Sequence, residues 1–463
     1  MAISAARKIA FDVLRRVAAE NAYAADLLYT QLARGTKKAD AALAKELTLG
    51  VLRRQRLLDL LLEGYLDRQV EELDIEVLLA LRLGMYQLRY LDRVPQHAAI
   101  DESVELVKRA RKSSAAGMVN AVLRRGAAQA RVSGADLDRL VTERLVGARE
   151  AERLGIVHSH PTWLVERWLR SFGEERTTAL LEANNRPAPL TCAVLEEETS
   201  EEIARSLRKS GLEVTPGRWL RGALHISGGD AASSEAYRAG KINFQDEASQ
   251  MVAHLVDAGA SESVLDLCAA PGGKTILLAR AAGAGGQVVA ADLHEHRLRA
   301  VREQLTRTRT ANVRLVALDA TRPLPFSEPF NRVLVDAPCS GTGTLSRNPE
   351  IRWRLKPEDL EIAHRCQTAM LKNALASAAR SGGGATRVVY STCSLEPEEN
   401  EGVVAEALAE TREWHVTSGQ AALRPHLRQA KAAEKFFGAD GFFRTFPPEY
   451  STDGFFAAVM ERS

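Results

Sequence analysis

From residue 241 onward, short apolar runs alternate with helical stretches, and this alternation most constrains what the chain can fold into. The runs are VLDLC, QVVAAD, VRLVALD, RVLVDAP and TRVVYSTCS. Each of them ends at or near a carboxylate or a cysteine. Strands separated by helices form a doubly wound parallel sheet, and such sheets bind ligands at the carboxyl ends of their strands. The sequence therefore predicts an α/β domain with polar residues gathered at one edge.

The chain before this domain follows two other patterns. Residues 6–125 have the apolar periodicity of helices and few strand signals. Residues 161–240 alternate between helical and extended stretches, which indicates a small α+β domain. A chain of 463 residues is too long for one core. We expect an all-α domain over 1–128, a helical linker with a small α+β domain over 129–240, and the parallel-sheet domain over 241–463.

Composition excludes several classes of protein. The formal net charge of +2 gives no global field for nucleic acid, so any basic surface must be local. The five cysteines are scattered and form no Cys-x-x-Cys or Cys/His cluster, which argues against a metal site. We see no signal peptide and no apolar run long enough to span a bilayer. We therefore expect a cytoplasmic monomer with reduced thiols, no metal and no membrane contact.

The stretch LDLCAAPGGKT, which starts at Leu265, is a glycine-rich loop after a strand-like run. A triphosphate loop needs a glycine where this chain has Cys268, and the Gly-x-Gly-x-x-Gly pattern of dinucleotide loops is absent. The next two runs end at Asp292 and Asp319. An acid in that place accepts ribose hydroxyls in nucleotide-binding sheets, although Asp292 could instead cap the helix that follows it.

A ligand with a ribose and little or no phosphate suits these features, and S-adenosylmethionine fits them. Its amino-acid end would meet the loop backbone, Asp292 would take the ribose, and Asp319 would lie by the adenine. The expected cofactor residues are Cys268, Ala269, Ala270, Pro271, Gly272, Gly273, Lys274, Asp292, Asp319 and Asp336.

Two cysteines follow strand ends in loops of small polar residues. Cys339 lies in DAPCSGTG and Cys393 in STCSLEPEENE. In a doubly wound sheet these loops border the same cleft, so we expect both thiols to be functional. For Cys192, Cys268 and Cys366 we keep a structural interpretation, although Cys268 could line the cofactor loop.

Together, DLCAAPGGKT, DAPCSGTG and STCSLEPEENE resemble the motifs of RNA cytosine-5 methyltransferases of the NOL1/NOP2/Sun family. The resemblance covers nearly the full chain, because HAAIDESVELVKRAR and MVNAVLRR resemble a NusB-like RNA-binding domain. This architecture resembles that of bacterial members that modify 16S ribosomal RNA. It implies a Rossmann-like class I methyltransferase domain, S-adenosylmethionine as cofactor, and an RNA partner with an unpaired or flipped cytosine.

The resemblance also implies roles for individual residues. Cys393 is the expected nucleophile on C6 of the cytosine, and Cys339 assists proton abstraction and release. An analogy to DNA cytosine methyltransferases would choose Cys339 as nucleophile instead. Asp336 would hydrogen-bond the base, and Lys274 would lie near the base or the cofactor carboxylate. The basic residues expected to bind RNA are Lys108, Arg109, Arg111, Lys112, Arg124 and Arg125. The alternative is that these residues only form solvated helix faces.

Some positions depart from the family pattern. Cys192, Ala193 and Val194 replace an Arg-Val-Asn-like strand, Asn348 stands where the family often has His, and the segment before Gly454 is long. These departures affect the expected RNA contacts. Three other functions stay open: a transfer-RNA cytosine-5 methyltransferase, a small-molecule methyltransferase, and a non-catalytic RNA-binding or ribosome assembly factor.

Overall fold

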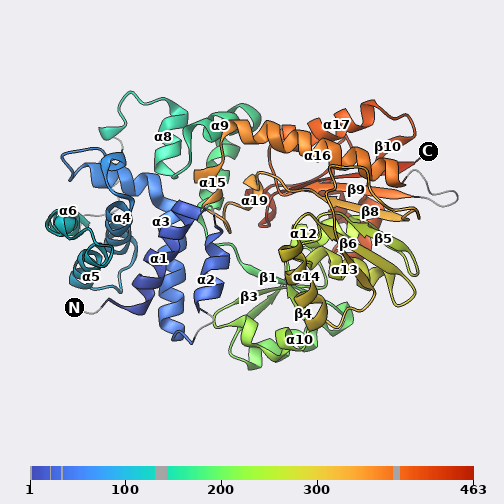
Figure 1. Cartoon of the computed structure of the whole chain (residues 1–463), viewed down its shortest axis with the longest axis horizontal. Helices are drawn as coiled ribbons and strands as arrows, with labels where there is room; N and C mark the ends of the chain where they lie inside the picture. Colours follow the sequence, from blue (N-terminus) through green and yellow to red (C-terminus); the bar gives the residue numbers. More distant parts are fainter. Residues whose placement is uncertain are drawn as a thin grey trace. The chain divides into compact units, whose positions relative to one another are not determined.

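A computed structural model describes residues 3–20, 22–32, 35–130, 141, 143–378 and 386–462. The chain divides into two compact units (Figure 1). The first comprises Met1–Pro187 and Leu345–Leu355, and the second comprises Ala188–Thr344 and Lys356–Ser463. The expected three-domain boundaries remain a prediction. The middle of the expected helical linker, residues 131–140 and 142, lies outside the described residues.

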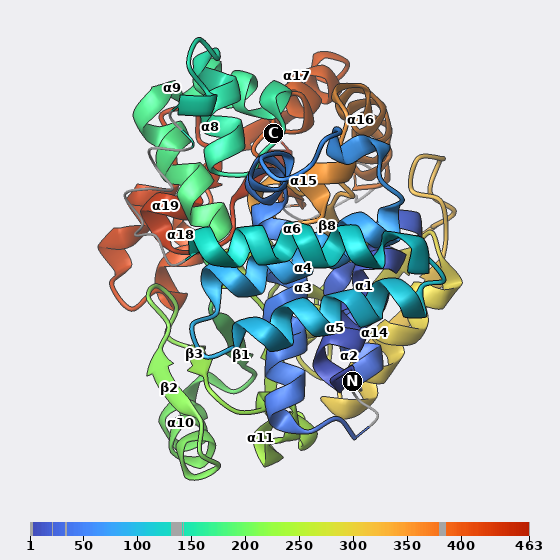
Figure 2. The ribbon, with the colours of Figure 1, turned by 90° about the vertical axis from the view of Figure 1, so that its left-hand side faces the viewer.

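The first unit is built from helices, as the periodicity of residues 6–125 predicts. Its core is formed by buried aliphatic side chains such as Leu14, Leu47 and Leu81. Figure 2 shows α5 and α6 running side by side across one face of this unit. The helices are α1 (Ala5–Glu20), α2 (Ala24–Leu32), α3 (Lys38–Glu63), α4 (Ile75–Tyr90), α5 (Gln96–Arg109), α6 (Ala116–Ala130), α8 (Glu150–Val157), α9 (Thr162–Asn185) and α15 (Ile351–Arg354).

A four-stranded antiparallel sheet begins the second unit. Its strand order is β2-β3-β1-β4, and Thr191 pairs with His225 in its register. Cys192 is fully buried in the core beneath it. This sheet agrees with the expected small α+β fold, although α9 groups with the first unit and β4 lies beyond the expected boundary at residue 240. The elements of this region are β1 (Leu190–Val194), α10 (Ser200–Lys209), β2 (Glu213–Pro216), β3 (Ala223–Ser227), α11 (Glu235–Arg238) and β4 (Ile242–Phe244).

The large sheet of the second unit has the order β10-β12-β9-β8-β5-β6-β7, with β11 paired to β12. Strands β9, β8, β5, β6 and β7 are mutually parallel, which confirms the predicted parallel sheet. Strand β12 adds to its edge in the antiparallel direction. The strands are β5 (Ser263–Asp266), β6 (Gln287–Asp292), β7 (Val313–Ala317), β8 (Arg332–Asp336), β9 (Arg387–Thr392), β10 (Trp414–Thr417), β11 (Phe443–Thr445) and β12 (Phe455–Arg462).

Helices cover both faces of this sheet (Figure 1). Successive residues of β8 alternate between the two cores, because side chains of a strand point to opposite faces. Leu334 packs toward α12 and α13, whereas Val333 and Val335 pack toward α16 and α17. The helices are α12 (Glu247–Leu255), α13 (Gly273–Ala282), α14 (Glu295–Arg307), α16 (Pro357–Ala378), α17 (Glu401–Ala409), α18 (Gln420–Leu423) and α19 (Pro447–Tyr450).

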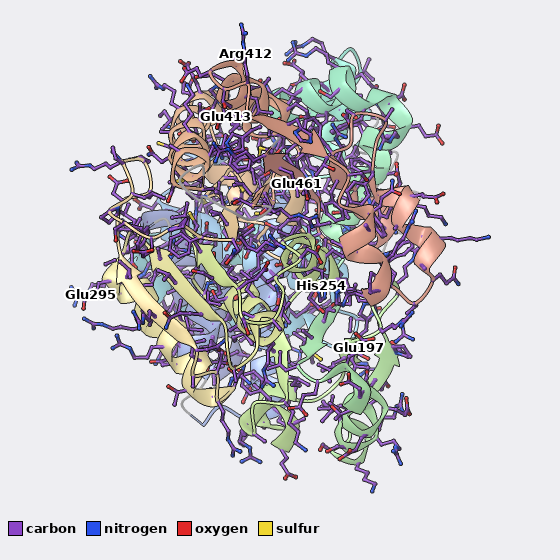
Figure 3. The ribbon with its side chains drawn as sticks, turned by 90° about the vertical axis from the view of Figure 1, so that its right-hand side faces the viewer. Glu197, His254, Glu295, Arg412, Glu413 and Glu461 are labelled. Carbon is purple, nitrogen blue, oxygen red and sulfur yellow. The ribbon has the colours of Figure 1, made fainter. Side chains whose placement is uncertain are left out.

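One ion pair ties β12 to the parallel part of the sheet, and another ties β12 to the segment before β10. Figure 3 labels Glu461 on β12 and Glu413 just before β10. Glu461 pairs with Arg387 of β9 at 2.7 Å, and Glu413 pairs with Arg462 of β12 at 2.8 Å. The strand order reverses at β5, since β6 and β7 follow on one side and β8 and β9 on the other. This switch point is where such sheets bind ligands.

Candidate active site

The glycine-rich loop connects β5 to α13 at the switch point. Residues Leu267–Gly272 form the turn, and Gly272 has φ of +106°, a backbone conformation that side chains strongly disfavour. A Cβ at this position would also meet Cγ1 of Val301 at 3.2 Å. The loop closes onto the strand through Thr275, whose hydroxyl donates to Oδ2 of Asp266 at 2.7 Å. The backbone amides in the first turn of a helix have no acceptor within the helix, so the start of α13 suits a polar or anionic ligand group.

Two buried carboxylates beside this loop each keep an oxygen without a hydrogen-bond partner among the described residues. These atoms are Oδ1 of Asp266 and Oδ2 of Asp292. Burial raises the pKa of Asp266 from 3.8 to about 7. Oδ2 of Asp292 lies 3.4 Å from the guanidinium of Arg297, an ion pair whose geometry falls short of a hydrogen bond. Orphaned acceptors of this kind fit a cofactor that brings hydroxyl or ammonium donors.

Asp319 is differently placed from Asp292. Its carboxylate already accepts from the hydroxyl of Thr321 at 2.6 Å and from the Thr321 amide at 3.0 Å. The hydrogen bond from the Thr321 side chain is the main cause that lowers the pKa of Asp319. A ligand would therefore meet an acid at Asp319 that is already satisfied in part.

Asp336, the last residue of β8, bonds both to Lys274, the other expected base-binding residue, and to Ser391 on the neighbouring strand β9. Its Oδ2 accepts from the ammonium of Lys274 at 2.7 Å, and its Oδ1 accepts from the hydroxyl of Ser391 at 2.8 Å. The ammonium also lies 5.1 Å from the centre of the Phe455 ring. The helix dipole disfavours a lysine at the start of α13, and the Asp336 carboxylate offsets this effect.

The sulfur atoms of Cys339 and Cys393 are 3.4 Å apart, and both residues are half-buried. The expected meeting of the two loops is thus observed. Backbone contacts pin the loops together: the Gly343 amide donates to the Cys393 carbonyl at 2.9 Å, and the Leu395 amide donates to the Thr342 hydroxyl at 2.9 Å. The hydrogen bond between the thiols and then burial raise the pKa of Cys339 well above its ordinary value.

Glu399 organises both thiol loops, and the sequence alone did not single it out. It is fully buried. Its carboxylate accepts from the Ser340 amide at 2.8 Å and from the Gln367 amide group at 3.0 Å. The hydroxyls of Ser340 and Ser394 also donate to it. The run EPEEN contains three acids, of which Glu396 and Glu399 are buried, and its pattern does not say which one meets the thiol loops.

The remaining cysteines do not join this pair. Cys192 is buried, and burial raises its pKa to about 12, which suits the expected structural thiol. Cys268 is half-buried in the glycine-rich loop, where burial also raises its pKa. Cys366 is exposed on α16. The described residues contain no cluster of His, Cys, Asp and Glu that could hold a metal, and none of the described helices could cross a membrane.

The basic residues expected to bind RNA lie at the end of α5, in the turn after it, and on α6. Three of the first four already pair with acids: Lys108 with Glu105, Arg109 with Asp12, and Lys112 with Asp74. Arg124 and Arg125 donate to the side chain of Asn120 and the carbonyl of Tyr65, respectively. RNA phosphates would have to compete with these partners.

The chain matches three family models. Residues 253–461 match 16S rRNA methyltransferase RsmB/F, residues 4–128 match the NusB family, and residues 160–231 match the ferredoxin-like domain of RsmF/B-like methyltransferases. Two solved structures share the fold. PH0851 has a TM-score of 0.79 at 22% identity and covers 99% of both chains. NSun6 from Pyrococcus horikoshii with SFG has a TM-score of 0.57 at 20% identity, covering 66% of this chain and 99% of its own.

A curated relative extends the match over the whole length. The probable ribosomal RNA small subunit methyltransferase B of Synechocystis sp. is 32% identical over 99% of this chain and 99% of its own. The helical, ferredoxin-like and Rossmann-like parts occur in the same order as the matched models. The chain therefore belongs to the RsmB/F family and is a methyltransferase.

Proposed function

We propose that this methyltransferase modifies C5 of an unpaired or flipped cytosine in 16S ribosomal RNA, with S-adenosylmethionine as the methyl donor. The contact between the sulfur atoms of Cys339 and Cys393, at 3.4 Å, is the observation that carries the proposal. A small-molecule methyltransferase needs neither thiol. The match to 16S rRNA methyltransferase RsmB/F supports ribosomal RNA as the substrate class.

Cys393 acts as the nucleophile. Carbon C5 of cytosine is a poor nucleophile, and a thiolate that bonds to C6 moves the C5–C6 double-bond electrons onto C5. S-adenosylmethionine, when bound, supplies an electrophilic methyl group to that carbon. Because the two sulfurs contact each other, ionisation of one opposes ionisation of the second. The contact with Cys393 and then burial raise the pKa of Cys339, so a thiolate on one sulfur favours the thiol form of its neighbour. The choice of Cys393 as the nucleophile rests on the resemblance of its Ser-Thr-Cys-Ser loop to the RNA methyltransferase family.

Cys339 acts in the release step. After C5 carries its methyl group, a base takes the C5 proton, the electrons of that C–H bond restore the double bond, and the bond between sulfur and C6 breaks. The thiolate of Cys393 is then the leaving group. Once Cys393 is bonded to C6 it carries no charge that opposes ionisation of Cys339, so the Cys339 thiol can lose its proton to solvent and then take the C5 proton as a thiolate. Its sulfur is already in contact with the atom that leaves.

Asp336 and Lys274 hold the base edge. The Asp336 carboxylate is fixed by Lys274 and Ser391 and can still accept from the exocyclic amine or a protonated ring nitrogen. Lys274 neutralises charge that builds up on the ring or on a cofactor carboxylate. The glycine-rich loop, with Asp266 and Asp292, holds the cofactor, because the orphaned oxygens of these acids match its ammonium and hydroxyl donors.

Bisulfite sequencing of ribosomal RNA tests this function directly. Cells that lack the gene should lose one protected cytosine in 16S RNA, and the intact gene should restore it. The Cys393→Ala variant should not restore it while it still binds S-adenosylmethionine. Appreciable protection from that variant would overturn the assignment of the nucleophile, and unchanged 16S RNA in the deletion strain would overturn the substrate.

A further inference from the structure

Two hollows lie within the second unit, away from the thiols. The larger, of about 780 Å³, is lined by loops of the small antiparallel sheet and by the ends of α13 and α14, and the smaller, of about 580 Å³, lies between α14 and β7. Both are lined by Arg309, Thr310 and Ala311, so they adjoin. Together they are called the trough, whose lining residues come from 195–199, 239–241, 279–284 and 302–315.

The trough lies at the opposite edge of the large sheet from the candidate active site. Residues 283–284 and 308–312 of its lining precede β6 and β7, respectively, and so lie at the amino ends of these parallel strands. Cys339 and Cys393 instead follow the carboxyl ends of β8 and β9. A ligand in the trough is therefore not the cofactor or the target base.

Arg307, at the end of α14, holds the two sides of the larger hollow together. Its guanidinium donates to the carbonyls of Tyr237 and Ile242, both at 2.8 Å, and lies 4.0 Å from the centre of the Tyr237 ring. Gly240, with φ of +74°, packs so closely on this helix end that a Cβ there would lie 2.1 Å from the Arg307 carbonyl oxygen. The small sheet and α14 are thus fixed to each other, and the hollow between them has a defined shape.

Cations without partners line the trough. The side chains of Lys241, Arg302 and Arg309 are exposed and have no hydrogen-bond or ion-pair partner among the described residues. Arg280 adds a fourth cation, which lies 3.4 Å from the carboxylate of Glu196. Glu196 is the only acid that lines either hollow. The trough therefore carries a local positive charge, although the whole chain is nearly neutral.

The carbonyl groups at the ends of α13 and α14 are already hydrogen-bonded. The side-chain amide of Asn312 donates to the carbonyls of Ala279 and Gly283, both at 2.9 Å. Arg280 donates to the carbonyl of Thr308 at 3.2 Å. A cationic ligand would have to compete with these donors and would meet the cations of the trough, so an anion is the class of ligand that fits.

The cations of the trough differ from the basic cluster at the end of α5. There, Lys108, Arg109 and Lys112 each pair with an acid. A phosphate that approaches that cluster competes with carboxylates, whereas one that approaches the trough displaces only water and mobile ions. The trough should therefore gain more from each phosphate that it binds.

We propose that the trough binds the sugar–phosphate backbone of the RNA substrate at a distance from the target cytosine. The inference rests on the proposed RNA substrate. Cations spread over two adjoining hollows suit a chain of phosphates better than a single small anion, and ribosomal RNA is long enough to contact both edges of the sheet. Contacts of this kind add affinity that depends on salt and carry no sequence information.

A triple variant, Lys241→Gln, Arg302→Gln and Arg309→Gln, tests the proposal by filter binding to 16S ribosomal RNA over a range of salt concentrations. We expect the slope of log affinity against log salt to become shallower by about two, and the affinity at about 0.15 M salt to fall at least about tenfold. Because these side chains are exposed, the melting temperature should stay that of the parent.

The matched control, Lys209→Gln, Arg412→Gln and Lys431→Gln, removes the same number of charges from the same unit. These side chains are exposed, lie outside the trough and also have no partner among the described residues. Figure 3 shows Arg412 pointing away from the ribbon into solvent. The control should change the slope by less than about one. Equal changes of slope in the two triple variants would overturn the trough as an RNA site.

Steady-state kinetics give a second measurement. Because the trough lies away from the thiols, the KM for 16S RNA should rise at least about fivefold in the trough variant, with kcat and S-adenosylmethionine affinity within about twofold of the parent. An unchanged KM, or a fall in kcat at saturating RNA, would overturn the proposal. Filter binding needs no methyl transfer, so a failure of the trough proposal is distinguishable from a failure of the cytosine chemistry.

Discussion

At the carboxyl ends of β5 and β6, one buried carboxylate oxygen of Asp266 and one of Asp292 lack a hydrogen-bond partner among the described residues, whereas at the ends of β8 and β9 most polar groups bond to one another, Oε1 of Gln367 excepted. Glu399 is the clearest case of the second kind, since donors from Ser340, Ser394 and Gln367 surround it. The two regions lie on neighbouring strands of one sheet.

This difference indicates that one end of the site binds a ligand and the other end carries out the chemistry. Unsatisfied buried acceptors are unfavourable unless a ligand completes them, so the β5–β6 end is shaped for an arriving molecule. A network whose members are bonded to one another holds side chains in fixed directions before any substrate binds. The β8–β9 end is therefore preorganised for chemistry, and the two ends should respond differently to mutation.

Glu399→Gln should have the largest effect among tests of this comparison. An amide replaces one accepting oxygen with a donor and disrupts the network that joins both thiol loops. We expect turnover to fall about 10- to 100-fold and stability to fall by about 1–3 kcal/mol, while cofactor affinity changes little. The matched control is Glu398→Gln, because Glu398 is exposed. Similar turnover in both variants, measured by methyl incorporation into RNA, would contradict preorganisation by Glu399.

Asp292→Asn should act on binding instead. Oδ2 of the buried carboxylate has no hydrogen-bond partner among the described residues and can accept from a ribose hydroxyl, and an amide is a weaker, uncharged acceptor. We expect the dissociation constant of S-adenosylmethionine to rise about tenfold with the melting temperature of the free protein nearly unchanged. Asp319→Asn is the control, because Thr321 already occupies that acid. Calorimetric titration of both variants should show the larger loss at Asp292; the reverse order would reassign the ribose acid.

Asp266 should make stability depend on pH. Its folded pKa of about 7 lies above the unfolded value of 3.8, so the folded state holds a proton that the unfolded state has lost. The free energy of unfolding should therefore fall as pH rises from about 4 to about 7, by on the order of 4 kcal/mol. Asp266→Asn removes this dependence. The difference in melting temperature between pH 5 and pH 8 should be smaller in the variant than in the parent. The same difference in both proteins would show that Asp266 ionises normally.

Neutralising Lys108, Arg109, Arg111 and Lys112 together should have the smallest effect. Three of these cations are paired with acids, so RNA gains less from them than from free charges. We expect the slope of log affinity against log salt to become shallower by about one, with cofactor affinity unchanged. Filter binding over a range of salt concentrations measures this slope. An unchanged slope would make the cluster an ordinary solvated helix face.

Much of this architecture was predictable from local pattern. Strand runs that end in Asp292 and Asp336 mark a parallel sheet, and the loops of Cys339 and Cys393 had to share its carboxyl edge once the strands were parallel. Apolar periodicity likewise predicts the helical first domain. These features depend on residue spacing within one or two elements, which a sequence displays directly.

Other features depend on contacts between distant segments, and local pattern does not reveal them. Glu399 looks like its acidic neighbours until α16 brings Gln367 against it. In the sequence, Arg352 resembles any other basic residue near a turn, although it is buried in the helical unit. The surface cluster at Lys108 looks free in sequence because its partners Asp12 and Asp74 lie far away along the chain.

Peptide mapping of the covalent complex trapped by Cys339→Ala on 16S RNA tests directly whether Cys393 bonds to the target base. We expect a nuclease-resistant nucleotide adduct on the peptide that contains Cys393, and we expect it to disappear in the Cys339→Ala, Cys393→Ala double variant. An adduct attached elsewhere, or none under conditions where the variant binds both RNA and S-adenosylmethionine, would contradict it.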